Sequence, residues 1–230
     1  MNTLGLDACK KGWCVVGYIE GALVWGCFDY IEDVVAAFPK VNRMLIDIPI
    51  GLSSENFNRT VDAKARTYLQ KRKSSIFSPP CREAVYADNY RKALEINKII
   101  TGKGISIQAY NISSKIREID VWFKTKPKAM EVYEAHPELC FKSLYGNDLE
   151  YSKHDKEGIS MRKKILFSQE PKLEDVFEDL MKRFKRSEVK PDDILDAMAL
   201  HLINRTADLS FVEDDNTVDE TGKKVGIVYA

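Results

Sequence analysis

The chain has 230 residues, 44% of them hydrophobic and 30% charged, and its formal net charge is zero. This composition predicts a soluble globular protein with either two domains or one domain that carries a large insertion. Zero net charge argues against nucleic-acid binding through a uniformly basic surface. No apolar run approaches the ~18 residues that a membrane span needs. Five cysteines without metal-ligand spacing favour a reducing compartment, and without a secretion signal pattern we expect a cytoplasmic protein.

The first third of the chain reads as strands followed by a helix and a further strand. Three apolar runs separated by short turns predict an antiparallel meander, over residues 2–7, 13–20 and 22–30. Apolar residues at helical spacing predict a helix over 31–38. The continuous apolar run 44–52 predicts a strand buried on both faces, as in a parallel sheet.

The rest of the chain is mainly helical in pattern. Residues 53–128 predict a helical insertion, because so long a segment between two strands exceeds a simple crossover. A fifth strand is expected over 129–135, followed by helices that include one over 173–184. Pro191 fits the first turn of a last long helix. The acidic segment of about 210–230 is expected to be a flexible tail.

Four aspartates mark places where a carboxylate interrupts or borders an apolar element. Asp7 ends the first strand and Asp47 lies near the carboxyl end of the fourth, where Pro49 stops pairing. Asp193 and Asp196 share a face of the last helix. Four like charges at one sheet edge would repel one another, so divalent cations, Mg²⁺ or Mn²⁺, are expected to hold them. Alternatively, Asp193 and Asp196 have no metal-binding role and only interact favourably with the helix dipole at the start of the helix.

Several motifs resemble one family over nearly the whole chain. They are Gly5-Leu6-Asp7-Ala8-Cys9-Lys10-Lys11-Gly12-Trp13, Ile46-Asp47-Ile48-Pro49-Ile50-Gly51-Leu52, Arg72-Lys73-Ser74-Ser75-Ile76-Phe77, Tyr110-Asn111-Ile112, Lys115-Ile116-Arg117-Glu118, Tyr133-Glu134-Ala135-His136-Pro137-Glu138 and Asp193-Ile194-Leu195-Asp196-Ala197. The sequence is similar to the family called domain of unknown function 429, whose members are regarded as predicted nucleases of the ribonuclease H-like superfamily.

This resemblance implies an α/β fold with a ribonuclease H-like mixed sheet of five strands, an antiparallel meander beside parallel strands, and helices on both faces. It also implies that the metal-binding carboxylates come from the first strand, the fourth strand and the last helix. In this chain these are Asp7, Asp47, Asp193 and Asp196. The expected substrate is nucleic acid, cleaved at a phosphodiester by a metal-activated water.

Further candidates stand beside this acidic set. Glu134 is either a polar strand end or a catalytic group that orients a ligand or water, and His136 has the same two interpretations. A breaker-rich loop and a basic segment hold weaker substrate-binding candidates, which are Arg72, Ser74, Ser75, Arg82, Lys153 and Arg162. His201 and the three tryptophans are expected to pack in the core.

Two other functions fit the same sequence. A phosphotransferase similar to the actin-like sugar kinases is one, although those proteins combine two related domains with glycine-rich phosphate loops. The other is a non-enzymatic module that binds a small ligand or a protein partner, which zero net charge slightly favours.

Overall fold

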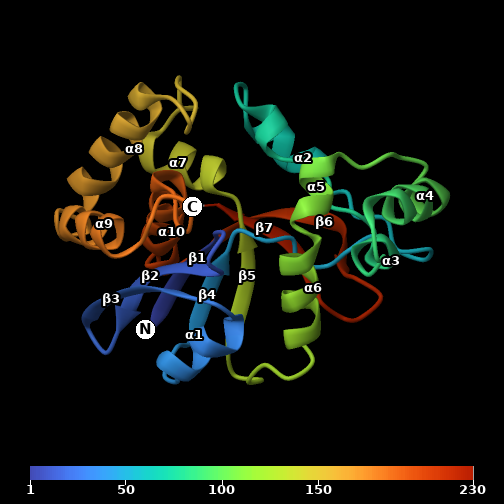
Figure 1. Ribbon diagram of the computed structural model, residues 1–230, viewed down its shortest axis with the longest axis horizontal. Coiled ribbons are helices and arrows are strands. Elements are labelled where there is room, and N and C mark those ends of the chain that lie inside the picture. Colours follow the sequence, from blue (N-terminus) through green and yellow to red (C-terminus); the bar gives the residue numbers. More distant parts are fainter. Residues whose placement is uncertain (230) are drawn as a thin grey trace.

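Strand β1 (Thr3–Ala8) lies between β2 (Trp13–Ile19), with which it pairs antiparallel, and β4 (Arg43–Ile46), with which it pairs parallel. These strands belong to a seven-stranded sheet with the order β3-β2-β1-β4-β5-β7-β6 (Figure 1). The other strands are β3 (Ala22–Phe28), β5 (Glu131–Ala135), β6 (Ser210–Val218) and β7 (Lys224–Tyr229). The structure is a computed structural model, and it describes residues 1–229.

The predicted α/β architecture is confirmed for the first five strands. β1, β2 and β3 form the expected antiparallel meander, and β4 and β5 continue the sheet in parallel with β1. β4 is shorter than the apolar run from which it was predicted, because pairing ends at Ile46 and the chain then leaves the sheet.

Two helical layers cover the sheet. The helices outside the insertion are α1 (Ile31–Ala37), α7 (Pro137–Tyr145), α8 (Lys156–Gln169), α9 (Lys172–Arg183) and α10 (Pro191–Asn204). Successive side chains of β2 point to opposite faces of the sheet. Cys14 and Val16 pack with the layer of α7 to α10, whereas Trp13 and Val15 pack with α1 and α6. In the described residues, no helix is long and apolar enough to cross a membrane.

The predicted insertion is helical and projects to one side of the sheet (Figure 1). Its helices are α2 (Val61–Tyr68), a 3₁₀ turn (Lys73–Ser75), α3 (Arg82–Val85), α4 (Tyr90–Thr101), α5 (Ile107–Asn111) and α6 (Ser113–Trp122). The second part of the insertion has its own small apolar cluster, to which Cys81, Ala93 and Ile105 belong. The insertion therefore packs partly on itself and partly on the sheet.

The prediction of a flexible tail was wrong, and so was the prediction of a five-stranded sheet. Residues 210–229 form the hairpin β6–β7, and β7 adds in parallel to β5. Val212, Val225 and Ile227 are buried on one face of this hairpin against α2 and its neighbours. The acidic residues that suggested a solvated tail have partners: Asp214 accepts the backbone N–H groups of Thr60 and Val61 at the start of α2.

Candidate metal centre

Asp7 and Asp47 lie side by side at one edge of the sheet. Asp7 is the next-to-last residue of β1, and its side chain is 5% exposed. Asp47 directly follows β4, and its N–H still donates to the carbonyl of Leu6 at 3.0 Å. Since β1 and β4 are parallel, their carboxyl ends meet at the same edge and bring the two carboxylates together.

Helix α10 supplies the third carboxylate, because it lies directly on β1. A side chain at Gly5 would not fit there, since its Cβ would come within 2.3 Å of the backbone nitrogen of His201. This close approach places Asp196, 1% exposed, over the end of β1. The glycine in the first strand thus sets the distance between the helix and the two strand-borne aspartates.

Asp7, Asp47 and Asp196 form a compact acidic triad. One carboxylate oxygen from each lies within 4.8 Å of the others. Burial and the neighbouring carboxylates Asp47 and Asp196 raise the pKa of Asp7 well above its usual range. Burial raises the pKa of Asp47 to about 7, against the opposing effect of Lys153. Oδ1 of Asp196 is buried and has no hydrogen-bond donor among the described residues. An acceptor in that position is suited to bind a cation.

Lys153 is the counter-charge of the triad. Its ammonium nitrogen lies 2.7 Å from Oδ2 of Asp196, and this carboxylate together with Asp7 and Asp47 raises the pKa of Lys153 despite its burial. The loop that carries Lys153 is held by α8, because a Cβ at Gly158 would overlap the carbonyl oxygen of Ser152. Lys153 was predicted only as a weak substrate contact, and it lies at the triad itself.

Asp193 is not part of the triad, although it lines the same pocket. Its Oδ2 accepts the backbone N–H of Lys190 at 2.8 Å, so the side chain is turned back to the start of α10. Burial raises the pKa of Asp193 to about 6. The structure therefore brings three of the four predicted aspartates together and gives the fourth a capping contact.

Glu134 also lines the pocket, but its carboxylate is engaged in a buried ion-pair network. Arg59 lies 2.6 Å from Oε1 of Glu134 and 2.8 Å from Oδ1 of Asp62. The N–H of Ile50 donates to Oε2 of Glu134 at 2.7 Å. These contacts join β5, the segment after β4 and the start of α2. Glu134 thus holds the insertion against the sheet. Arg59 and Asp62 were not among the predicted site residues, and their i, i+3 spacing within the predicted helical insertion was the only available signal.

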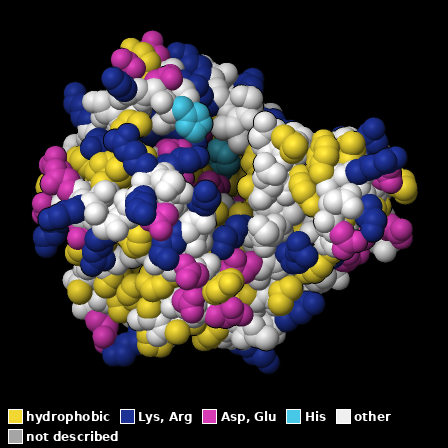
Figure 2. Space-filling view, viewed as in Figure 1, with side chains coloured by type: hydrophobic (Ala, Val, Ile, Leu, Met, Phe, Trp, Pro, Cys, Tyr) yellow, Lys and Arg dark blue, Asp and Glu magenta, His cyan; other side chains and the backbone are white. Residues whose placement is uncertain are grey.

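The triad forms part of the wall of a pocket of about 450 Å³ between the insertion and the layer of α7 and α8. Figure 2 shows this pocket as a deep cleft with histidine side chains on its wall. His136 is one of the lining residues; its Nδ1 accepts the N–H of Glu138, and its Nε2 faces the carbonyl of Ser75, both at 3.3 Å. Burial lowers the pKa of His136, which favours the neutral ring.

Four of the six weaker substrate candidates line this pocket, Lys153 among them, and two do not. Arg72, Ser74 and Ser75 form part of the wall on the side of the insertion. Arg82 forms ion pairs with Asp120 and Asp219 and lies outside the pocket lining. Arg162 also lies outside it.

Arg162 has a structural position in the helical layer. Its side chain is fully buried, and its guanidinium is 2.6 Å from Oε1 of Glu138. A second guanidinium nitrogen donates to the carbonyls of Tyr151 and Gly158. Arg162 therefore fixes the loop before α8, and through that loop the position of Lys153.

Comparison with known families gives a match over most of the chain. Residues 5–214 match the family described as "Protein of unknown function (DUF429)". The chain belongs to this family. The family resemblance noted from the motifs is thus confirmed, and the match includes the triad and Lys153 but ends within β6. No curated protein and no solved structure matches the chain.

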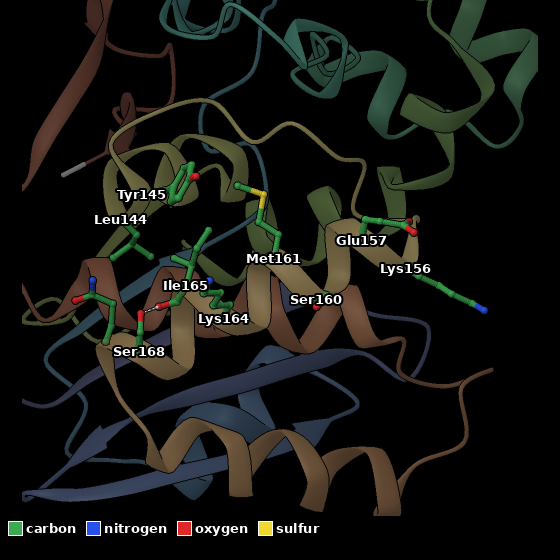
Figure 3. A pocket seen from close by; sticks show the side chains of 10 residues that line it. Leu144, Tyr145, Lys156, Glu157, Ser160, Met161, Lys164, Ile165 and Ser168 are labelled. Carbon is green, nitrogen blue, oxygen red and sulfur yellow. Dashed lines mark hydrogen bonds between the residues drawn. The ribbon is translucent and has the colours of Figure 1, made fainter.

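A second, larger hollow of about 790 Å³ lies between the end of α7 and α8 (Figure 3). Leu144, Tyr145, Met161 and Ile165 give it an apolar lining, with Lys156, Glu157 and Lys164 near its border. The triad does not contribute to it. Size alone therefore does not identify the chemically equipped site in this DUF429 protein.

Proposed function

We propose that this protein is a divalent-metal-dependent phosphodiesterase that acts on nucleic acid. The observation that carries the proposal is the acidic triad of Asp7, Asp47 and Asp196 in a pocket open to a ligand. Asp7 and Asp196 are buried, and one oxygen of Asp196 has no hydrogen-bond partner among the described residues. Three aspartates crowded around one lysine are costly to ionise together, and a bound cation removes that cost.

The donor set fits Mg²⁺ or Mn²⁺. All three side chains offer hard oxygen ligands, and oxygen donors are those that these ions prefer. Asp7, Asp47 and Asp196 would hold the ion. When bound, the ion neutralises charge on a phosphodiester and lowers the pKa of a water molecule.

The chain's own groups then position the substrate. Lys153 has an ammonium at the triad, where it can donate to a phosphate oxygen as well as to Asp196. Arg72 lies across the same pocket. In the hydrolysis, a bond forms between the oxygen of water and phosphorus, the P–O ester bond breaks, and the released alcohol oxygen takes up a proton.

We further propose that the fold is ribonuclease H-like. The support is the order of β1 to β5, an antiparallel meander joined through β1 to two parallel strands, together with carboxylates on the first strand, after the fourth and on the last helix. The hairpin β6–β7 is an addition to this arrangement.

A Mn²⁺ titration followed by thermal unfolding tests the metal site. We expect Mn²⁺ to raise the Tm of the wild type. At a free Mn²⁺ concentration one hundred times the Kd, the free energy of unfolding should rise by ~2.7 kcal/mol. Asp7→Asn should lose this response, whereas Asp208→Asn, an exposed acid, should keep it. Cleavage of nucleic acids is then assayed with and without Mn²⁺. Cleavage without metal, or equal cleavage by Asp7→Asn, would refute the proposal.

A further inference from the structure

The pocket above the triad is small and deep. Its volume of about 450 Å³ lies in the ~300–1,000 Å³ range of small-molecule sites. A double helix, in contrast, is bound over ~1,000–2,500 Å² of protein surface with many phosphate contacts. Since Asp7 and Asp196 are almost fully buried, a scissile phosphate has to enter the pocket to reach them. This depth favours one nucleotide at a time.

The two walls of the pocket are joined by hydrogen bonds. The backbone N–H groups of Gln70 and Lys71, in the insertion, both donate to Oδ2 of Asp148 at 2.5 Å. The guanidinium of Arg72 donates to the carbonyl of Glu150 at 2.9 Å. These contacts join the insertion to the loop before Lys153, so protein closes the pocket on that side.

One wall presents an aromatic side chain. Phe77 lines the pocket and is 39% exposed, and in the part of the chain that the structure describes it belongs to none of the four apolar clusters. Its neighbour Ile76, in contrast, is buried among Val61 and Leu69. A partly exposed aromatic ring that borders a polar pocket offers a surface on which a base can stack.

Two cationic side chains line the same pocket as Phe77, and they are those of Arg72 and Lys153. The pocket therefore combines three kinds of group. The acidic triad can hold a metal ion that binds a phosphate, the cationic side chains match the charge of that phosphate, and the aromatic ring can stack on a nucleobase.

We infer that the pocket takes one unpaired nucleotide, with its base stacked on Phe77 and its phosphodiester at the triad, so that the substrate is single-stranded nucleic acid. A base within a duplex has both faces stacked on its neighbours and cannot stack on Phe77 until it is extruded. This inference rests on the proposed function, because it assigns the substrate class of the same site.

The test compares a single-stranded oligonucleotide with the same sequence in a duplex, in the presence of Mn²⁺. We expect the wild type to cleave the single strand at least ~10-fold faster. Phe77→Ala should raise KM for the single strand by roughly 5- to 150-fold, the equivalent of one lost base stack. Phe77→Trp should retain the wild-type KM. Tyr145→Ala, which removes an exposed aromatic outside the pocket, is the matched control.

A strand with an abasic position at the cleaved nucleotide identifies the contact. The wild type should bind and cleave the abasic strand as weakly as Phe77→Ala binds and cleaves the intact strand. Phe77→Ala should treat the abasic and intact strands alike. The inference would be overturned by equal cleavage of duplex and single strand, or by additive effects of removing the Phe77 ring and removing the base. Either result would leave the proposed metal-dependent phosphodiesterase activity unaffected.

Binding separates this result from failure of the proposed function. Fluorescence anisotropy of labelled strands on Asp7→Asn measures the same preference without cleavage. If no strand is cleaved by the wild type, the proposed function fails; the inference fails as well if single strands do not bind more tightly than duplexes.

Discussion

The ammonium nitrogen of Lys153 lies 2.7 Å from Oδ2 of Asp196, inside a group of three carboxylates. A cation that enters this group meets a lysine already in place. Metal binding is therefore expected to compete with the Lys153 ammonium for the negative charge of the triad.

Replacement of Lys153 by Met should have opposite effects without and with metal. Without metal, loss of the counter-charge should destabilise the fold by ~1–3 kcal/mol, since a buried carboxylate loses its charged partner. With Mn²⁺, the rise in Tm should exceed that of the wild type, because no ammonium competes with the ion. Lys156→Met, at an exposed lysine on the same segment, is the control. A smaller Mn²⁺ response in Lys153→Met would contradict competition between lysine and metal.

Asp193 and Asp196 offer a matched pair on one helix. Asp193→Asn should retain the Mn²⁺ response and lose only the contribution of a helix-start contact, ~0.3–1.5 kcal/mol, because its carboxylate accepts the Lys190 N–H. Asp196→Asn should abolish the response. Calorimetric titration with Mn²⁺ measures both. Equal loss of binding in the two variants would show that Asp193 turns toward the metal.

Glu134 is expected to stabilise the fold without binding the metal. Removal of one partner from a buried ion pair costs ~3–5 kcal/mol, so Arg59→Met should shift urea unfolding strongly by leaving Glu134 and Asp62 unpaired. Glu134→Gln should be less stable than the wild type and still respond to Mn²⁺. A folded Glu134→Gln protein that no longer responds would place Glu134 among the ligands.

Acid stability should depend on Glu170. Its carboxylate faces His201, accepts the Tyr18 hydroxyl at 2.6 Å and lies 2.7 Å from Arg205, and these contacts lower its pKa to about 2. Because the folded-state pKa lies below the unfolded value, the stabilisation is complete above about pH 4.5 and is lost as the pH falls toward 2.

Urea unfolding at pH 6, 4 and 3 measures this dependence. Glu170→Gln should be less stable at pH 6 and lose less stability between pH 6 and 3 than the wild type, by at most about 3 kcal/mol. Parallel pH curves for the two proteins would show that Glu170 does not supply the effect.

Apolar runs and helical spacing in the sequence correctly predicted where strands end and which helix face is buried. The apolar run that ends at Asp7, and the run that Pro49 interrupts after Asp47, placed both carboxylates at strand ends. Helical spacing placed Asp196 on a face that packs. The meander, the parallel strands and the helical insertion followed from the same periodicities.

The remaining features depend on contacts between distant residues. The segment with Asp214 and Asp219 has the composition of a tail, and only its partners Thr60 and Arg82 make it part of the fold. Whether Lys153 meets Asp196 depends on the close approach of Gly158 to Ser152. Asp193 and Asp196 look equivalent on a helical wheel, and the Lys190 N–H distinguishes them.

The hairpin β6–β7 has a consequence for the order of assembly during synthesis. Asp214 holds the start of α2, Asp219 pairs with Arg82, and Val225 packs against Gly51, whose φ is +79°. A nascent chain that ends before residue 210 already contains all three aspartates and Lys153, yet it lacks the groups that hold the insertion beside them. The pocket is therefore completed only after residues 210–229 have left the ribosome. A chain terminated before them has the metal-binding aspartates but lacks the residues that hold the insertion in place.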